Sequence, residues 1–164
     1  MGSAGHTSLI MGLAIDASNR IVAAGYADLT GTTGGTHVAV ARYNSDGSAD
    51  SGFGTNGYST FAMLPNGSDG WSVALQADGK IVVGGFSTPS SGPTQMAVAR
   101  LITTGAPDGN FGTGGYAIVD FSPFGDTGGD GYAVLVQPDG KIVVAGAATV
   151  GPSGGGVALA RYWP

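Results

Sequence analysis

Aspartate is the residue type in this sequence with the greatest capacity for chemistry. All 11 acidic residues are Asp, there is no Cys, and the only two histidines are His6 and His37. The lack of Cys removes disulfides, thiolate metal ligands and cysteine nucleophiles. The chemistry left to the chain is that of carboxylates: binding a divalent cation, or acid–base catalysis by a hydrolase of small esters, lactones or glycosides.

Two aspartates, Asp69 and Asp130, have the most suggestive spacing. Each stands two positions before an aromatic residue, Trp71 or Tyr132, and Asp126 lies close to the second one. If the strands that follow are innermost in a ring of sheets, these carboxylates lie at the mouth of a central channel, where the field is focused. The five residues are therefore candidates for binding a small-molecule or glycan ligand, or calcium or another divalent cation. The structural alternative is that the aspartates cap the start of a strand.

Three polar or glycine-rich segments match part or all of the residue pattern of a known motif but lack features that the motif requires. Residues 52–57 fit the dinucleotide fingerprint, which works only between a strand and a helix. Residues 151–155 fit the nucleophile elbow, which needs a following helix and a histidine base. Residues 44–50 lack the glycine and the bidentate acid of a calcium loop. We interpret all three as turns, assign no metal site to them, and give His37 a surface role.

The charge distribution argues against two classes of partner. The net charge is −5 and the six basic residues are scattered, whereas nucleic-acid binding needs clustered Lys and Arg. The longest apolar run, residues 142–148, is far shorter than the about 20 residues of a membrane helix. We therefore expect neither nucleic acid nor a membrane as a partner. Residues 1–7 carry no positively charged region, so no signal peptide is predicted and the localisation stays open.

The sequence repeats itself three times. A first block carries a basic residue at 20, 80 and 141, at intervals of 60 and 61 residues. A second block, Ala-x-Ala-Arg, follows each copy, and a third, Asp-x-x-Phe-Gly, follows the first two. The marked positions of these blocks are Arg42, Arg100, Arg161, Asp50, Asp108, Phe53 and Phe111. Because they recur at equivalent places, we interpret them as structural positions rather than as one active site.

Within one copy the periodicity is that of β-strands. Apolar residues alternate with small or polar ones from 71 to 76, and Asp78-Gly79 then supplies a tight two-residue hairpin turn. In copy one, Asn19 takes the left-handed position of this turn. A third strand near residues 95–101 and a fourth near 116–121 follow. Each copy is therefore predicted to be a four-stranded antiparallel meander.

Both faces of these strands are apolar, so each sheet must be covered on both sides. A ring of sheets does so, and we predict an all-β fold of β-propeller blades in a single domain, residues 1–164. The repeats extend over about 9–61, 69–121 and 130–164, and the last is incomplete, with three strands. Since propellers close with four to eight blades, we predict a half-ring that dimerises into a six-bladed propeller, or else an excerpt of a longer array.

The repeated blocks resemble the delta-60 repeat, a bacterial tandem repeat grouped with β-propeller domains of unknown function. The resemblance rests on Asp-Gly-Lys-Ile-Val-Val-x-Gly, Ala-x-Ala-Arg and Asp-x-x-Phe-Gly-x-x-Gly in this order, and it covers the chain from about Leu9 onwards. Copy one departs most, with Ser-Asn-Arg in place of Asp-Gly-Lys. The resemblance implies a scaffold without defined catalytic residues, in a protein that is exported or at the bacterial cell surface.

Three functions fit these observations. The leading one is a noncatalytic scaffold or ligand-binding module that assembles as a homodimer through its open blade faces. The second is a hydrolase of small esters, lactones or glycosides, with its site at the channel or at the seam between chains. The third is a structural repeat of a larger exported protein. No cofactor is expected in the leading case, apart from the divalent cation considered above.

Overall fold

The chain folds into three antiparallel β-sheets, which confirms the predicted all-β class. The computed structural model describes residues 7–29, 35–119, 121, 126–150 and 154–164, and eleven strands lie within them. The first sheet consists of β1 (Ser8–Ile15), β2 (Ile21–Asp28), β3 (Thr36–Tyr43) and β4 (Tyr58–Phe61). The second consists of β5 (Ser68–Leu75), β6 (Ile81–Ser87), β7 (Gln95–Leu101) and β8 (Tyr116–Ile118). The third consists of β9 (Asp126–Val136), β10 (Ile142–Val150) and β11 (Gly154–Tyr162).

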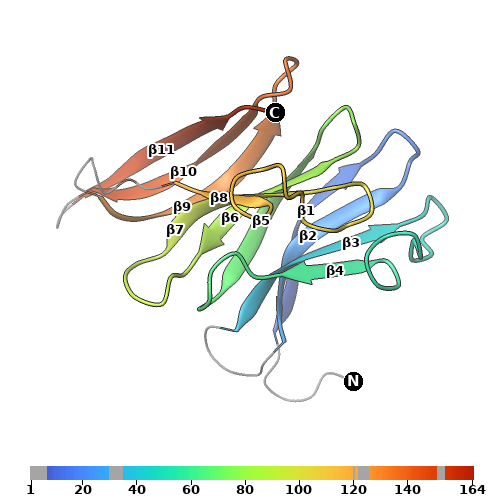
Figure 1. Ribbon diagram of the computed structural model, residues 1–164, viewed down its shortest axis with the longest axis horizontal. Helices are drawn as coiled ribbons and strands as arrows, with labels where there is room; N and C mark the ends of the chain where they lie inside the picture. The colour runs from blue at the N-terminus through green and yellow to red at the C-terminus, as the bar shows by residue number, and fades with distance from the viewer. Residues whose placement is uncertain (1–6, 30–34, 120, 122–125, 151–153) are drawn as a thin grey trace.

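Each sheet is a meander, since strands that neighbour each other in the sheet are also consecutive in the chain. Figure 1 shows the sheets in chain order, from β1–β4 at the right to β9–β11 at the upper left. The first strands of successive sheets contact one another, β1 with β5 and β5 with β9. This is consistent with propeller blades whose first strands lie innermost, and the sheets are called blades 1, 2 and 3 below. The described part of the chain contains no helix able to cross a membrane.

The loop between the first two strands has the same hydrogen bonds in all three blades. In blade 2 the Gln76 amide donates to the Lys80 carbonyl at 2.9 Å, so the loop has three residues and not the predicted two. Gly79 has a φ of 82° in this loop, and Asn19 has a φ of 57° at the equivalent position of blade 1. The left-handed asparagine predicted from the sequence is thus confirmed. The extra residue gives the loop a twist that suits antiparallel strands.

The outer strands are shorter than the sequence suggested. β8 ends at Ile118 and not near residue 121, although the Val119 amide still donates to the Met96 carbonyl at 2.8 Å. Blade 3 has only three strands among the described residues, as predicted for the incomplete copy. The outer edges of blades 1 and 2 are therefore closed by strands of four and three residues, and the outer edge of blade 3 is β11.

A β-bulge interrupts the first strand of every blade. In blade 2 the pairing of β5 with β6 skips Trp71, and Gly85 lies opposite the bulge. A Cβ on Gly85 would lie 1.9 Å from the carbonyl oxygen of Asp69, a distance at which no side chain fits. The bulged residues are Met11, Trp71 and Tyr132, and the glycines opposite are Gly25, Gly85 and Gly146. The repeated glycine is therefore a geometric requirement of the bulge.

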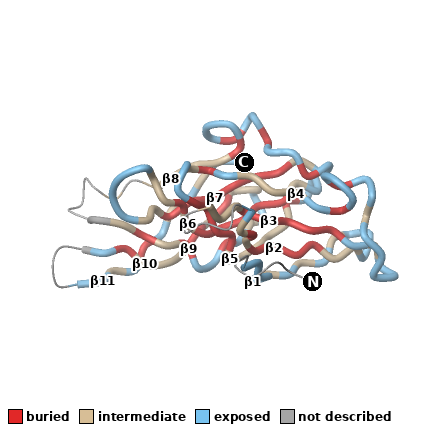
Figure 2. The backbone as a smooth tube through the Cα atoms, turned by 90° about the horizontal axis from the view of Figure 1, so that it is seen from below, coloured by how far each residue is buried: buried red, intermediate tan, exposed pale blue. Residues whose placement is uncertain are grey.

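Blade 2 is buried on both faces. Ile81 and Val83 on β6 pack against blade 1, whereas Val82 points the other way and packs against blade 3. Figure 2 shows buried backbone concentrated in the middle of the molecule and exposed backbone at the turns and along much of β11. Each fully buried aliphatic side chain contributes about 1.5–3 kcal/mol. The expectation of a sheet covered on both sides is confirmed for this central blade.

The bulge geometry predicts the effect of a single methyl group. We expect Gly85→Ala to lower the free energy of unfolding by about 2 kcal/mol or more, because strand β5 must move away from β6. Gly109→Ala is the matched control, since a Cβ there meets nothing within 4 Å. Its effect should stay within about 0.5 kcal/mol in urea unfolding followed by circular dichroism. Equal effects of the two substitutions would contradict the role assigned to the bulge.

Candidate functional site

Blade 1 contains a buried cluster of one arginine, one aspartate and one phenylalanine, called an Arg–Asp–Phe cluster below. Arg42 on β3 lies on the face that packs against blade 2, where its side chain is 6 % exposed. Its Nε donates to Oδ2 of Asp50 at 2.7 Å, and its guanidinium carbon lies 4.6 Å from the centre of the buried Phe53 ring. Asp50 also accepts a hydrogen bond from the Gly52 amide at 2.9 Å, so one carboxylate holds both the turn and the arginine.

Blade 2 repeats this cluster with nearly identical geometry. Nε of Arg100 donates to Oδ2 of Asp108 at 2.8 Å, and the guanidinium carbon lies 4.6 Å from the centre of the Phe111 ring. The Asn110 amide donates to Oδ1 of Asp108 at 3.0 Å. The basic residue of the first repeat block also approaches this carboxylate, with Nζ of Lys80 at 3.6 Å. Two cations and one anion therefore meet at the end of each complete blade.

The electrostatics of the cluster favour the ionised aspartate. Burial by itself raises the pKa of the Asp108 carboxyl, but the Asn110 amide and the charge of Arg100 outweigh it and hold the pKa below its ordinary value. The Gly52 amide is the main cause of the lowered pKa of Asp50, and Arg42 adds to it. A carboxylate that accepts amide and guanidinium hydrogen bonds loses them on protonation, so both clusters require the charged form.

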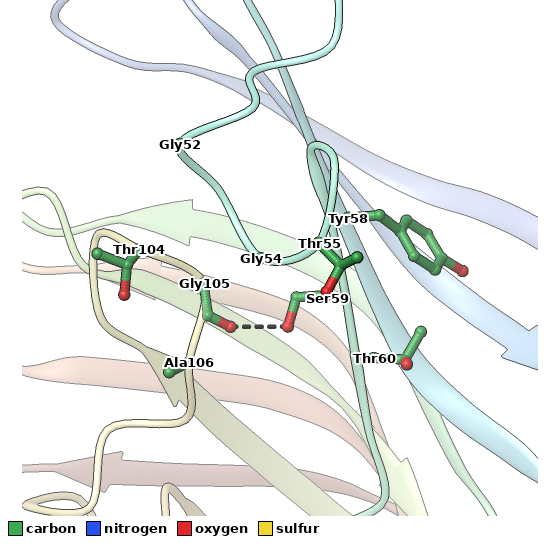
Figure 3. A pocket seen from close by; sticks show the side chains of 9 residues that line it. All are labelled: Gly52, Gly54, Thr55, Tyr58, Ser59, Thr60, Thr104, Gly105 and Ala106. Atoms are coloured by element: carbon green, nitrogen blue, oxygen red, sulfur yellow. Dashed lines mark hydrogen bonds between the residues drawn. The ribbon is translucent and has the colours of Figure 1, made fainter.

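The cluster of blade 1 also reaches across the seam to blade 2. Nη1 of Arg42 donates to the Thr103 carbonyl, the Gly54 amide to the Thr104 carbonyl, and Oγ of Ser59 to the Gly105 carbonyl, each at 2.7 Å. Figure 3 shows the last of these hydrogen bonds, between Ser59 on β4 and the turn of blade 2 that contains Gly105. The sequence analysis missed this contact because its acceptors are main-chain carbonyls, which carry no sequence signature.

An open pocket of about 500 Å³ lies at this seam. Figure 3 shows it between the turn and strand of blade 1, with Tyr58 and Thr60, and the turn of blade 2, with Thr104 and Ala106. Its lining offers hydroxyl and main-chain groups but no Asp, His, Lys or Arg side chain. Tyr58 is the only titratable side chain in this lining, and burial raises the pKa of its phenol, so the lining offers no carboxylate or imidazole for acid–base catalysis.

The third arginine of the repeat has a different environment. Arg161 on β11 is exposed, and no hydrogen bond or ion pair joins it to another described residue. Lys141, the equivalent of Lys80, pairs with Asp139 in its own turn and lies 4.7 Å from the centre of the exposed Trp163 ring. In blade 3, Arg161 and Lys141 thus take the places of Arg100 and Lys80. Among the described residues, no aspartate pairs with Arg161 and no phenylalanine ring covers it.

Two sheet faces remain uncovered among the described residues. The N-face is the outer face of blade 1, and its exposed apolar residues are Leu13, Ile15, Tyr43 and Tyr58. The C-face is the outer face of blade 3, and its exposed residues are Leu135, Val157, Leu159 and Arg161. Apolar patches of this kind mark association sites. The sequence predicted open faces, but which side chains lie on them depends on the strand register.

The residues predicted for the channel mouth lie along the first strands. The rings of Trp71 and Tyr132 stack with centres 5.3 Å apart and an interplanar angle of 8°. Met11 is the equivalent bulged residue of blade 1, and sequence reasoning missed it because it is not aromatic. Tyr132 and Met11, at the two ends of this row, are each about half exposed.

The two aspartates of that prediction differ in environment. Asp69 is buried, one carboxylate oxygen has no hydrogen-bond partner among the described residues, and burial raises the pKa of its carboxyl. Hydrogen bonds from Thr36 and Trp71 offset this only in part. Asp130 is partly exposed. Asp126 begins β9, but its side chain lies outside the described part of the structure.

Neither a metal site nor a hydrolase site gains support from the described side chains. No group of three or more His, Cys, Asp or Glu residues gathers there closely enough to hold a metal ion. His37 lies near the start of β3, and its Nδ1 is 2.9 Å from the carbonyl oxygen of Gly35, two residues before it. The serine of segment 151–155 lies outside the described residues. The calcium and hydrolase interpretations therefore stay predictions.

Comparison with known families gives one match. Residues 17–53, 76–111 and 137–164 match a family described as a domain of unknown function (DUF5122) beta-propeller. The three segments together span more than half of the chain, and they contain the hairpin loops and the Arg–Asp–Phe clusters described above. No curated protein matches the chain. The finer resemblance to the delta-60 repeat stays a prediction.

The buried ion pair predicts a large loss of stability on removal of its anion. Asp108→Ala leaves Arg100 buried without a counter-charge, and we expect the free energy of unfolding to fall by about 3 kcal/mol or more. Asp78→Ala is the control, because its side chain is 53 % exposed and pairs only with Lys80 in the described structure. It should cost less than about 1 kcal/mol in the same urea titration. A small effect of Asp108→Ala would contradict a structural role for the cluster.

The raised pKa of Asp69 predicts a pH-dependent effect. Below its unfolded-state pKa, near 3.8, Asp69 is neutral in both the folded and the unfolded protein. As the pH rises from there through the higher folded-state pKa, ionisation of the buried carboxyl lowers the free energy of unfolding of the protein. Asp69→Asn should therefore raise the thermal midpoint at pH 7, and this gain should vanish near pH 3. A gain that is the same at both pH values would contradict the assignment.

Proposed function

Because the chain belongs to the DUF5122 family of β-propeller domains, whose function is unknown, we propose that it is a noncatalytic propeller module that assembles with a second copy. In this assembly the C-face of one copy packs on the N-face of the other. The two seams inside the chain serve as the template, since each joins the later face of one blade to the earlier face of the next.

The observation that carries this proposal is the exposure of residues whose repeat equivalents are fully buried. Val157 is 93 % exposed on the C-face, whereas its equivalents Val38 and Met96 are completely buried in the internal seams. On the N-face, Tyr43 is 38 % exposed, whereas its equivalent Leu101 is completely buried. Since the repeat gives these positions the same chemistry, the same kind of blade face is the partner that fits them.

The turn that follows β3 gives a second reason. Residues 44–48 of blade 1 have the same hydrogen-bonded turn as residues 102–106 of blade 2, and Gly47 and Gly105 have φ values of 85° and 92°. A Cβ on Gly105 would lie 2.9 Å from the Phe53 ring of the preceding blade, whereas one on Gly47 meets nothing within 4 Å. The N-face thus has the docking shape of an internal blade without the blade that docks there.

The row of bulged residues supports the same arrangement, in which the C-face of one copy packs on the N-face of the other. Trp71 of blade 2 stacks on Tyr132 of blade 3, and the next position in a continued row is occupied by Met11 of a second copy. Methionine sulfur makes favourable contacts with aromatic rings, so the two half-exposed ends of the row suit each other. Two copies joined at both pairs of faces place six blades in a closed ring, within the usual range for propellers.

The alternative functions have less support from the described side chains. A hydrolase would need an activated nucleophile or paired carboxylates, and no described pocket residue supplies one. A small-molecule or glycan ligand at the channel mouth would use the Tyr132 ring and Asp130, and in the assembly proposed here this place is partly taken by the second copy. A repeat within a larger exported protein would satisfy the same two faces with further blades of one polypeptide.

The assembly predicts the solution mass and its response to one substitution. Light scattering at micromolar concentration should give twice the mass of one chain. Leu159→Lys places a charge at the centre of the C-face and should weaken association by about tenfold or more. Leu29→Lys is the control, because Leu29 is also an exposed leucine but follows the end of β2 instead of lying on a strand of either face. A stable monomer of the unmodified chain would refute the proposal.

A further inference from the structure

The outer edge of blade 3 differs from the outer edges of the other two blades. In blade 1, Val38 to Ala41 of β3 pair with β4, and in blade 2, Ala97 to Ala99 of β7 pair with β8. β11 has β10 as its only neighbour among the described strands. An unpaired edge strand of nine residues presents a row of main-chain donors and acceptors.

The main chain around the arginine that recurs in each repeat shows what this edge can bind. In blade 2 the Arg100 amide donates to the Gly115 carbonyl, and the Arg100 carbonyl accepts from the Asp108 amide, both at 2.8 Å. Arg42 makes the same two hydrogen bonds with Gly57 and Asp50, both at 2.9 Å. Arg161 holds the equivalent place on β11, and no described segment makes these bonds to it.

The side chains at this edge indicate the chemistry of the missing segment. Arg161 and Lys141 stand where Arg100 and Lys80 converge on the carboxylate of Asp108. Arg161 is exposed, whereas in the other two blades a phenylalanine ring covers the equivalent guanidinium. The two cations, Arg161 and Lys141, would be neutralised by an aspartate. A phenylalanine three residues later would cover the exposed guanidinium of Arg161.

We propose that the outer edge of β11 is a binding site for an extended segment of a second polypeptide with the sequence chemistry Asp-x-x-Phe-Gly-x-x-Gly-Tyr. The segment adds to blade 3 as a fourth antiparallel strand. Its aspartate pairs with Arg161 and Lys141, and its phenylalanine ring covers the Arg161 guanidinium. Strand addition to an open edge is a common mode of peptide recognition, in which the main chain gives affinity and the side chains give specificity.

This site differs from the C-face and N-face contact in using the main chain along the edge of the sheet, although the Arg161 side chain belongs to both. The chain itself provides the probe, since residues 107–119 contain the aspartate, the phenylalanine and the fourth strand of blade 2. We would label a synthetic peptide of this sequence with fluorescein and titrate it with the whole protein, following fluorescence anisotropy. Saturable binding at a ratio of one peptide to one chain is expected.

Two variants of the peptide and one variant of the protein test the assigned contacts. Replacing the peptide's aspartate by asparagine, or its phenylalanine by alanine, should weaken binding by about tenfold each. Arg161→Gln in the protein should do the same, and the asparagine peptide should then lose less than it does with the unmodified protein, because only the contact with Lys141 is left to lose. Because Arg161 is exposed, this variant is expected to keep the unfolding midpoint of the unmodified protein. A urea titration of the variant checks this.

Three results would overturn the site. The first is the absence of saturable binding, and the second is equal binding of the original peptide and a scrambled peptide of the same composition. The third is that Arg161→Gln binds the original peptide as tightly as the unmodified protein does. The mass measurement on the protein without peptide is a separate readout, so failure of peptide binding leaves the proposed association of blade faces to stand or fall by itself.

Discussion

The buried ion pair of each complete blade is the interaction on which the rest of the structure depends. Arg42 and Arg100 lie on faces that pack against the next blade, where an unpaired charge would cost several kcal/mol. Asp50 and Asp108 neutralise them, and the same carboxylates accept turn amides. The turn is thereby fixed in a position that carries a phenylalanine over the guanidinium. In blade 1 the arginine then reaches the next blade, so one ion pair orders a turn, a ring and a seam.

The bulge in the first strand is the second constraint, and it shapes the inner side of the blades. A bulge turns one residue out of the ladder and increases the local twist. Gly85 has no side chain because the Asp69 carbonyl lies where a Cβ would be. The bulged Trp71 and Tyr132 side chains are then free to stack on each other across two blades. The outer rim is thus held by charge and the inner side by backbone geometry and ring contact.

Much of this fold is readable from the sequence, because each hairpin is encoded by local turn chemistry that recurs three times. The strand count, the left-handed Asn19 and the covered central sheet follow from patterns of a few residues. The contacts between blades do not, since their acceptors are carbonyls such as that of Thr103, and any residue type can supply a carbonyl. The burial of Asp69 is also invisible locally, because its neighbours in sequence resemble those of Asp130, yet Asp69 is buried and Asp130 is partly exposed.

Repetition explains why the terminal faces carry the side chains that they do. A repeat array needs end units with polar outer faces if those faces are to meet water. Blade 3 instead keeps Val157 and Leu159 at positions that are completely buried in the other two blades. Arg161 likewise keeps the chemistry of an internal arginine although no described carboxylate meets it. Polar residues at these two positions would cost blade 3 little, because neither aliphatic side chain is buried in its own core. The face and edge contacts proposed above would cover these aliphatic side chains and Arg161 with further β-structure of the same repeat chemistry.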